Sequence, residues 1–199
     1  MARRTLFTVG HSTRTWKEFV ELLKAWKIEE LIDVRTVPRS RAFPWFDSKT
    51  MGKRLAKDGI RYTHLASLGG LRHVKKDSPN TWGGGWRNAS FRGYANYMQT
   101  PEFAIGLKDL NSHRRMGGHR TCIMCSEAVW WRCHRRMIAD ALEARRIPVR
   151  HIMTEKSAPR HEITAFAVVS RHRGKPPTIT YPQQQWCLHK LSQDAEPRL

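Results

Sequence analysis

The sequence predicts an α/β fold: a mainly parallel sheet with helices on both faces, and a C-terminal β-hairpin appended to it. Short runs of β-branched and apolar residues alternate with longer segments of helical periodicity through the first 155 residues. Such alternation is typical of a parallel, Rossmann-like sheet, because parallel strands are joined by crossovers that are usually helices. A chain of 199 residues with 40% apolar residues is long enough for one domain with its own core.

The first half of the chain predicts three strands and two helices. Thr15 and Glu18 form a capping-box pattern, in which a hydroxyl and a carboxylate three residues apart satisfy the free amides of a helix start. An apolar stripe of helical spacing follows and ends at Trp26. The predicted strands are residues 5–9, 31–34 and 60–65, and the predicted helices are residues 15–26 and 48–58.

The second half predicts further strands and helices after a long polar loop over residues 71–93. A loop of this length inside a compact domain is uncommon and is often functional. Pro101 marks the first turn of one helix, a position where a missing amide proton costs nothing. The predicted helices are residues 94–98, a segment from residue 100 onward and residues 133–146, and the predicted strands are residues 121–125 and 149–153.

Composition divides the chain into three parts. Residues 1–155 form the predicted α/β domain. Residues 156–184 contain two β-like runs around a basic turn, which predict a hairpin packed on that domain, with strands at 165–169 and 178–181. Residues 185–199 are expected to form a flexible tail.

The charge balance indicates a polyanionic partner. Thirty-six Lys and Arg residues against 17 Asp and Glu give a formal net charge of +19. Clustered cations gain free energy by releasing counterions from phosphates, so we expect a nucleic acid or a phosphate-containing substrate. The sequence leaves the cofactor and the oligomeric state open.

The sequence favours a cytoplasmic protein that does not enter a membrane. No apolar run approaches the roughly 20 residues that a transmembrane helix needs. The basic start of the chain is followed by an apolar stretch that breaks at Gly10, unlike a secretory signal. Four cysteines are too few for a secreted disulfide scaffold of this length.

Reactive side chains gather where the predicted strands end. Ligands of such sheets bind beyond the carboxyl ends of the strands, so these residues are candidates for a shared site. Each has a structural alternative of its own: a buried histidine, a capping aspartate or a surface cation. The candidate catalytic residues are His11, Asp33, Cys125, Glu127, Cys133 and His134.

The same edge of the sheet and the polar loop supply candidate phosphate contacts. Cys133 lies near a predicted helix start, where free amides and the helix dipole favour either a thiolate or a bound phosphate. The candidate phosphate- or nucleic-acid-binding residues are Ser12, Arg35, Arg39, Arg87, Arg92, Arg132 and Arg135.

The cysteines differ in their predicted surroundings. Cys122 and Cys125 have the spacing of half a zinc site, but side chains alternate along a strand, so the two face opposite sides of the sheet. We therefore predict that Cys122 is a small core residue, whereas Cys125 meets Cys133 or His134. No metal site is assigned, although a metal bound by Cys125, Cys133 and a histidine stays open as an alternative.

A set of short motifs carries a family resemblance. The motifs are Thr8-Val9-Gly10-His11-Ser12-Thr13, Asp33-Val34-Arg35, Pro38-Arg39-Ser40, Leu68-Gly69-Gly70, Gly93-Tyr94-Ala95, and Cys125-x-Glu127 followed by Cys133-His134-Arg135. Together they resemble the bacterial "domain of unknown function 488" family over roughly residues 6–155. The resemblance implies an α/β domain with a site built from these strand-end residues, and it implies no established reaction. Cys122 lies outside the motifs.

The sequence favours an enzyme that acts on nucleic acid or nucleotides through this strand-end site. The combination of acid, base and thiol on a strongly basic chain supports this interpretation. One alternative is a non-catalytic nucleic-acid-binding protein, in which tryptophans offer stacking surfaces between cations. Another is a thiol-redox or metal-binding protein that uses Cys125 and Cys133.

Overall fold

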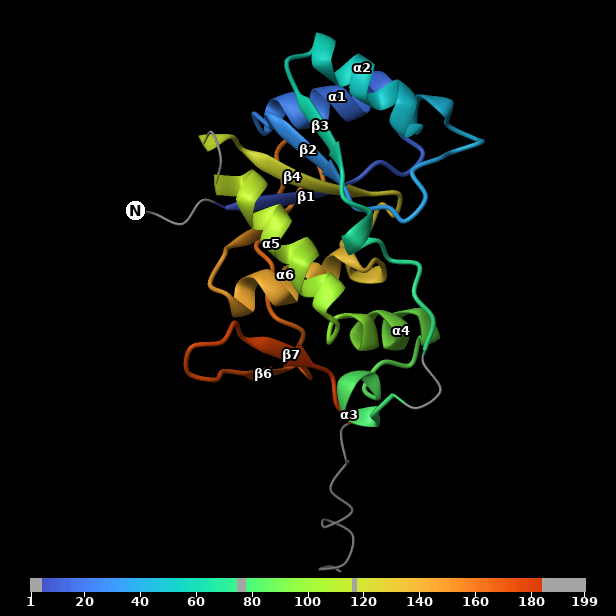
Figure 1. Cartoon of the computed structure of the whole chain (residues 1–199). Helices are drawn as coiled ribbons and strands as arrows, with labels where there is room; N and C mark the ends of the chain where they lie inside the picture. Colours follow the sequence, from blue (N-terminus) through green and yellow to red (C-terminus); the bar gives the residue numbers. More distant parts are fainter. Residues whose placement is uncertain (1–4, 75–77, 116–117, 184–199) are drawn as a thin grey trace, which may run out of the picture.

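A five-stranded parallel sheet forms the centre of the molecule in the computed structural model, which describes residues 5–74, 78–115 and 118–183 (Figure 1). The strand order is β3-β2-β4-β1-β5, with every neighbouring pair parallel. The α/β prediction and the predicted order of elements are confirmed. The strands are β1 (Leu6–Gly10), β2 (Glu30–Asp33), β3 (Arg61–His64), β4 (Thr121–Cys125) and β5 (Val149–His151).

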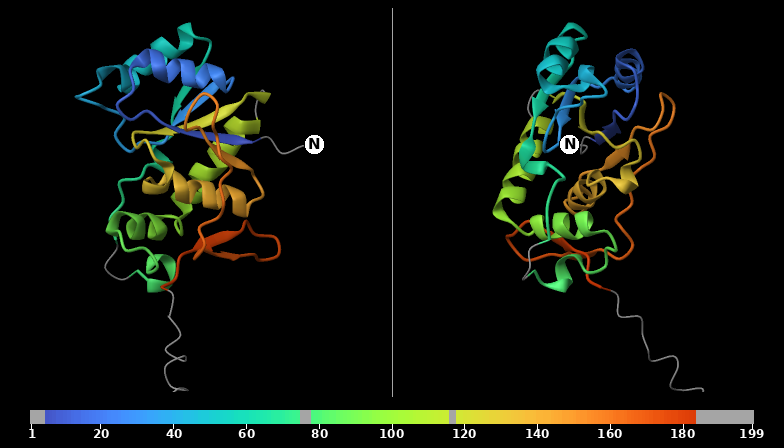
Figure 2. Two further views of the ribbon diagram at one scale, coloured as in Figure 1. Left: turned by 180° about the vertical axis from the view of Figure 1, so that it is seen from behind. Right: turned by 90° about the vertical axis from the view of Figure 1, so that its right-hand side faces the viewer.

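Helices cover both faces of this sheet and give the molecule three layers (Figures 1 and 2). On one face, α1 (Trp16–Ala25) and α2 (Ser48–Lys57) bury their apolar sides against the sheet. On the other face lie α5 (Pro101–Arg115) and α6 (Arg135–Ala144). The two faces therefore have separate hydrophobic cores.

Local sequence signals explain where these elements lie. Thr15 and Glu18 form the predicted capping box at the start of α1: the hydroxyl of Thr15 accepts from the amide of Glu18, whose carboxylate accepts from the amide of Thr15. All residues of β1 and β4 are buried, as expected for central strands covered on both faces.

Because side chains alternate along β4, Cys122 and Cys125 lie on opposite faces of the sheet, as predicted. Cys122 is fully buried in the core beneath α1 and α2. Cys125 lies on the opposite face of β4, in the core that contains Cys133. The thiols at 125 and 133 therefore share one side of the sheet, and Cys122 is excluded from it.

The polar segment 71–93 is more ordered than the sequence predicts. It contains α3 (Asn80–Gly83), and α4 (Ala89–Tyr97) begins within it, because the Asn88 side chain accepts hydrogen bonds from the first amides of that helix. Trp86 is buried against Phe166 and Tyr181 from the C-terminal part of the chain. These partners are far away in the sequence, which is why local composition alone suggested a loop.

A two-stranded antiparallel hairpin follows the sheet, as predicted. Its strands are β6 (Val168–Ser170) and β7 (Thr178–Thr180), so the first strand begins later than the predicted 165. Tyr181, just after β7, donates a hydrogen bond of 2.8 Å to the buried carboxylate of Asp140 in α6. The predicted tail at 185–199 lies outside the described residues. Throughout the described part of the chain, no helix is both long and apolar enough to cross a membrane.

Candidate functional site

A cleft of 430 Å³ opens at the carboxyl edge of the sheet. Its walls come from the ends of β1, β2 and β4, from the turn at Gly70 and from the residue before α6. The sequence-predicted residues that line it are His11, Arg35, Arg39, Cys125, Glu127 and His134. Separate segments of the chain thus meet at the edge where the sequence places the site.

Arg35 is held in one wall of the cleft by a buried ion pair. Its Nε and Nη2 donate to Asp33 at 2.9 and 2.6 Å, and Nη2 also donates to the carbonyl of Phe46 at 2.8 Å. The hydroxyl of Tyr62 donates to Asp33 at 2.7 Å, and burial together with this carboxylate raises the pKa of Tyr62. Asp33 is fully buried and does not line the cleft, so its role here is to orient Arg35.

His11 holds Arg35 from another side. Its Nδ1 lies 2.9 Å from the carbonyl of Ser12 and therefore carries the proton, which leaves Nε2 to accept from Nη1 of Arg35 at 3.3 Å. The ring stacks on Phe46, with centroids 4.1 Å apart. Burial is the main reason that the pKa of His11 falls to about 4, so the imidazole is neutral at pH 7.

The floor of the cleft contains two thiols and an imidazole, here called the sulfur–imidazole cluster: Cys125, Cys133 and His134. Nδ1 of His134 lies 3.6 Å from Sγ of Cys133 and 3.9 Å from Sγ of Cys125. All three atoms lie within 4.8 Å of one another. Cys125 and His134 line the cleft, whereas Cys133 lies behind them.

Backbone contacts fix the orientation of the His134 ring. Nε2 lies 3.1 Å from the carbonyl of Val34, which only accepts, so Nε2 donates and Nδ1 presents a lone pair to the sulfurs. The backbone of Gly70 packs on the ring so closely that a Cβ would collide with it. A Cβ on Gly69 would lie 2.5 Å from Oγ1 of Thr36. The paired glycines of the sequence motif are therefore required by close packing.

The two thiols of the cluster differ in acidity. Burial alone raises the pKa of Cys133, but a hydrogen bond from Cys125 and the charge of Arg135 outweigh it and lower that pKa to about 6. The same hydrogen bond is the largest cause that raises the pKa of Cys125 to about 12, with burial next. Cys133 is therefore the more acidic of the two thiols.

Arg135 is buried behind the cluster and belongs to a chain of polar contacts. Its Nε donates to Sγ of Cys133 at 3.4 Å, Nη2 donates to the carbonyl of Glu127, and Nη1 donates to Oγ1 of Thr8 at 3.4 Å. The carbonyl contact ties the β4–α6 connection to the start of α6. Arg135 is 1% exposed and does not line the cleft.

Three further polar residues extend this chain, here called the histidine relay: His151, His161 and Asp140. The hydroxyl of Thr8 donates to Nδ1 of His151 at 2.8 Å, Nε2 of His151 donates to Nδ1 of His161 at 2.9 Å, and Nε2 of His161 donates to Asp140 at 2.8 Å. Because the carboxylate of Asp140 only accepts, it determines which atom donates in each hydrogen bond of the relay. Sequence reasoning missed the relay because its members lie on β5, in the following segment and in α6.

The remaining predicted residues lie outside the cleft. Ser12 adopts a left-handed conformation with φ of 50° and lines a separate hollow beside Arg14. Arg87 and Arg92 lie at the start of α4, where Arg92 donates to the carbonyls of Trp86 and Arg87. Arg132 is exposed in the short 3-10 helix η4 (Trp130–Arg132) between β4 and α6.

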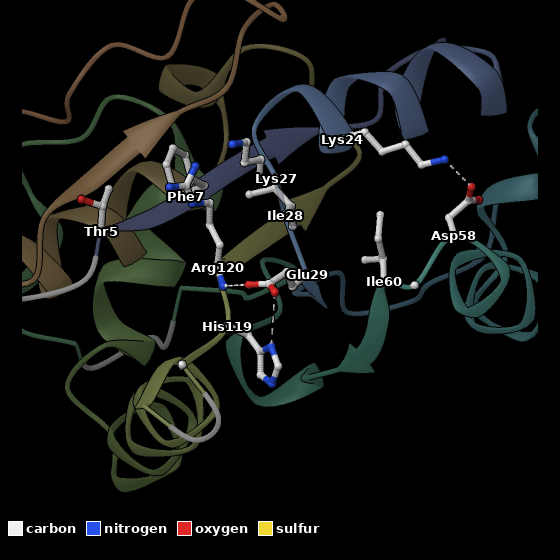
Figure 3. Close-up of a pocket in the computed structure, with 12 residues that line it drawn as sticks. Thr5, Phe7, Lys24, Lys27, Ile28, Glu29, Asp58, Ile60, His119 and Arg120 are labelled. Carbon is white, nitrogen blue, oxygen red and sulfur yellow. Dashed lines mark hydrogen bonds and ion pairs between the residues drawn. The ribbon is translucent and has the colours of Figure 1, made fainter.

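Besides the hollow of 670 Å³ beside Arg14, two further hollows are larger than the cleft, and the described residues that line them include no comparable group of side chains. One, of 720 Å³, lies at the amino ends of the strands, where Lys24 pairs with Asp58 at 2.7 Å and the amide of Arg120 donates to Glu29 at 2.9 Å (Figure 3). The other, of 1410 Å³, lies between α5, α6 and the hairpin. Neither includes a cysteine in its described lining, so the smaller strand-end cleft is the candidate site.

Comparison with known proteins identifies a family for the chain. The sequence model of the family described as "Domain of unknown function DUF488" matches residues 15–142. The matched segment contains Asp33, Arg35 and the whole sulfur–imidazole cluster, whereas β1 and His11 precede it. No curated protein matches the chain, and no solved structure matches it.

Proposed function

The chain belongs to the DUF488 family of domains of unknown function, and we propose that it is an enzyme that acts on nucleic acid or nucleotides at the strand-end cleft. One observation carries the proposal: two thiols and an oriented imidazole lie at the floor of a cleft in a chain with a net charge of +19. Reactive groups in a concave site favour catalysis over simple binding.

Substrate phosphates would be held at the rim of this cleft. Arg39 is exposed there, and Thr36 and Ser40 also line the cleft. The guanidinium of Arg35 adds a fixed positive charge to that wall, although most of its donors are already used by Asp33 and Phe46. Arg39 is therefore the best candidate for direct contact with a phosphate.

A base could stack close to the cleft. Trp131 is 45% exposed and lies in η4, on the connection that also carries Glu127. Arg132 is exposed beside it. Exposed aromatic rings between cations are stacking platforms for bases of any sequence, which supports a nucleic acid or nucleotide over a simple phosphate.

The chemistry would take place at the floor of the cleft. Glu127 is exposed at the rim and is the only carboxylate among the described lining residues, so it is the candidate for proton transfer. The sulfur–imidazole cluster supplies the reacting centre. His11 and Asp33 act as positioning residues for Arg35.

Binding is tested by the salt dependence of affinity for single-stranded DNA, single-stranded RNA and duplex oligonucleotides. Arg39→Ala should reduce the slope of log affinity against log salt by about 0.7–0.9, the share of one phosphate contact. Lys27→Ala is the matched control, because Lys27 is exposed beside the amino-end hollow instead. Absence of binding at low salt would refute the proposal.

Catalysis is tested with the same oligonucleotides and a set of nucleotides, with products identified by mass spectrometry. Wild-type protein should convert at least one substrate, and Cys125→Ser should abolish conversion while binding persists. Tight binding without conversion of any substrate would instead identify a non-catalytic nucleic-acid-binding protein.

A further inference from the structure

We propose that the sulfur–imidazole cluster binds a zinc ion through Sγ of Cys125, Sγ of Cys133 and Nδ1 of His134, with a fourth coordination position open to the cleft. The geometry of these three residues is by itself the basis for proposing that the ion binds. Only the use of the fourth position rests on the proposed function. The bound ion would supply a Lewis acid at the floor of the cleft.

The distances fit a tetrahedral ion. Bonds of about 2.3 Å to sulfur and about 2.0 Å to nitrogen hold those two ligand atoms about 3.5 Å apart at the tetrahedral angle. In the structure, Nδ1 of His134 lies 3.6 Å from Sγ of Cys133 and 3.9 Å from Sγ of Cys125. Small side-chain adjustments are therefore enough to bring all three atoms onto one ion.

The imidazole is already in the tautomer that a metal requires. Nε2 of His134 donates to the carbonyl of Val34 at 3.1 Å, so the lone pair of Nδ1 faces the two sulfurs. Metal-binding histidines usually donate their other ring proton to a carbonyl or carboxylate in this way. Gly70, packed against the ring, keeps it in this orientation.

A disulfide between the two cysteines explains less of this geometry. It would use both sulfurs and leave Nδ1 of His134 without a donor, at the centre of a largely buried cluster. A zinc ion uses all three atoms, and it releases the thiol protons to solvent as both sulfurs become thiolates. Two thiolates and a neutral imidazole balance the charge of a divalent ion, and thiolate with imidazole is a ligand set that suits zinc.

The surroundings favour a reactive ion over a purely structural one. Three protein ligands leave one position of a tetrahedron open, as in catalytic zinc sites. Cys125 and His134 line the cleft beside Glu127 and Arg39, so this position faces the proposed substrate site. A bound water or a substrate oxygen would occupy it, and Glu127 would accept the proton of that water. Arg135, which donates to Sγ of Cys133, orients that ligand.

Cobalt(II) substitution tests the site without any substrate. Full-length protein, treated with a chelator and titrated with cobalt, should bind one ion per chain. It should show the intense visible bands of a tetrahedral ion and sulfur-to-cobalt charge transfer at an intensity typical of two thiolates. Weak bands of an octahedral ion, or no bands, would overturn the proposal.

Matched cysteine variants assign the ligands. Cys125→Ser and Cys133→Ser should each lower zinc affinity at least about 100-fold, since even the loss of a residue that only supports a ligand costs 10–100-fold. Cys122→Ser is the control and should bind zinc like the wild type, because Cys122 lies on the other face of the sheet. Unchanged affinity in the first two variants would refute the assignment.

Alkylation of the wild-type protein gives a second measurement that no variant can disturb by misfolding. Zinc should protect Cys125 and Cys133 from labelling and leave the labelling of Cys122 unchanged. Equal labelling with and without zinc would contradict the site. Because none of these measurements involves nucleic acid, zinc binding without any oligonucleotide binding would reject the proposed function and leave the metal site intact.

Discussion

The two ends of the parallel sheet are both hollowed and both carry charged side chains, but they hold these charges differently. At the amino end, Lys24 and Asp58 form an ion pair with exposed fractions of 54% and 25% (Figure 3). At the carboxyl end, Arg35 and Asp33 form a pair with exposed fractions of 6% and 0%. The Lys24–Asp58 pair stays in solvent, whereas the Arg35–Asp33 pair is built into the wall of a cleft.

This difference indicates where the fold has been arranged for chemistry. Exposed pairs contribute little free energy and leave the surface adaptable. Burying a cation costs desolvation free energy, but a buried cation that is held by several acceptors is rigidly positioned and forms part of a fixed frame. At the carboxyl end that frame, made by Asp33, Arg35 and Arg135, surrounds the sulfur–imidazole cluster.

The largest effect should come from breaking one aspartate–cation pair at each end. Asp33→Ala leaves the buried Arg35 charge without its carboxylate, so it should lower the free energy of unfolding by about 3–5 kcal/mol. Asp58→Ala breaks an exposed pair and should cost at most about 1 kcal/mol. Urea unfolding at pH 7 measures both. Equal losses would mean that Arg35 is not buried as described.

A second contrast uses one glycine from each end. Gly70→Ala pushes a Cβ into the His134 ring, so it should cost about 1–3 kcal/mol of stability and lower zinc affinity about 10–100-fold. Gly59 has φ of 72°, and no atom of the described residues would lie within 4 Å of a Cβ added there. Gly59→Ala should therefore cost about 1–2 kcal/mol through backbone strain alone, with zinc affinity unchanged. Unfolding and zinc titration of both variants distinguish the two effects: both variants should lose stability, but only Gly70→Ala should also lose zinc affinity.

The last contrast concerns pH and the histidine relay. Burial is the main cause that lowers the pKa of His151 to about 2, and the neighbouring His161 and Arg135 lower it further. Below about pH 6.5 the unfolded chain protonates this histidine and the folded chain does not. The free energy of unfolding should therefore fall with decreasing pH, by up to about 1.4 kcal/mol per unit from this group.

One histidine variant checks the source of this pH dependence. His151→Gln keeps a hydrogen-bonding side chain and removes the titration, so its unfolding free energy should fall less steeply between pH 6.5 and 4.5. An unchanged slope in His151→Gln would assign the pH dependence to other groups.

Local patterns were enough to predict most of the fold. The capping box at Thr15 and Glu18 located the start of α1, and alternation along β4 separated Cys122 from Cys125. The same reasoning failed for residues 71–93, where Trp86 is buried against Phe166 and Tyr181. Their contact depends on a hairpin about 80 residues later, and no local pattern encodes it.

For the candidate site, the sequence by itself determined that His11, Arg35 and Cys125 come to the carboxyl edge, because parallel strands end together and side chains alternate along them. Only the tertiary structure decided what each residue does there. Arg35 and Arg135 looked equivalent to Arg39 as phosphate ligands, yet Asp33 and Thr8 hold the first two inside the protein, and of the three only Arg39 is exposed at the cleft. The direction of a side chain and the number of its donors already in use depend on partners that only folding brings close, and desolvation then fixes whether its charge is available to a ligand.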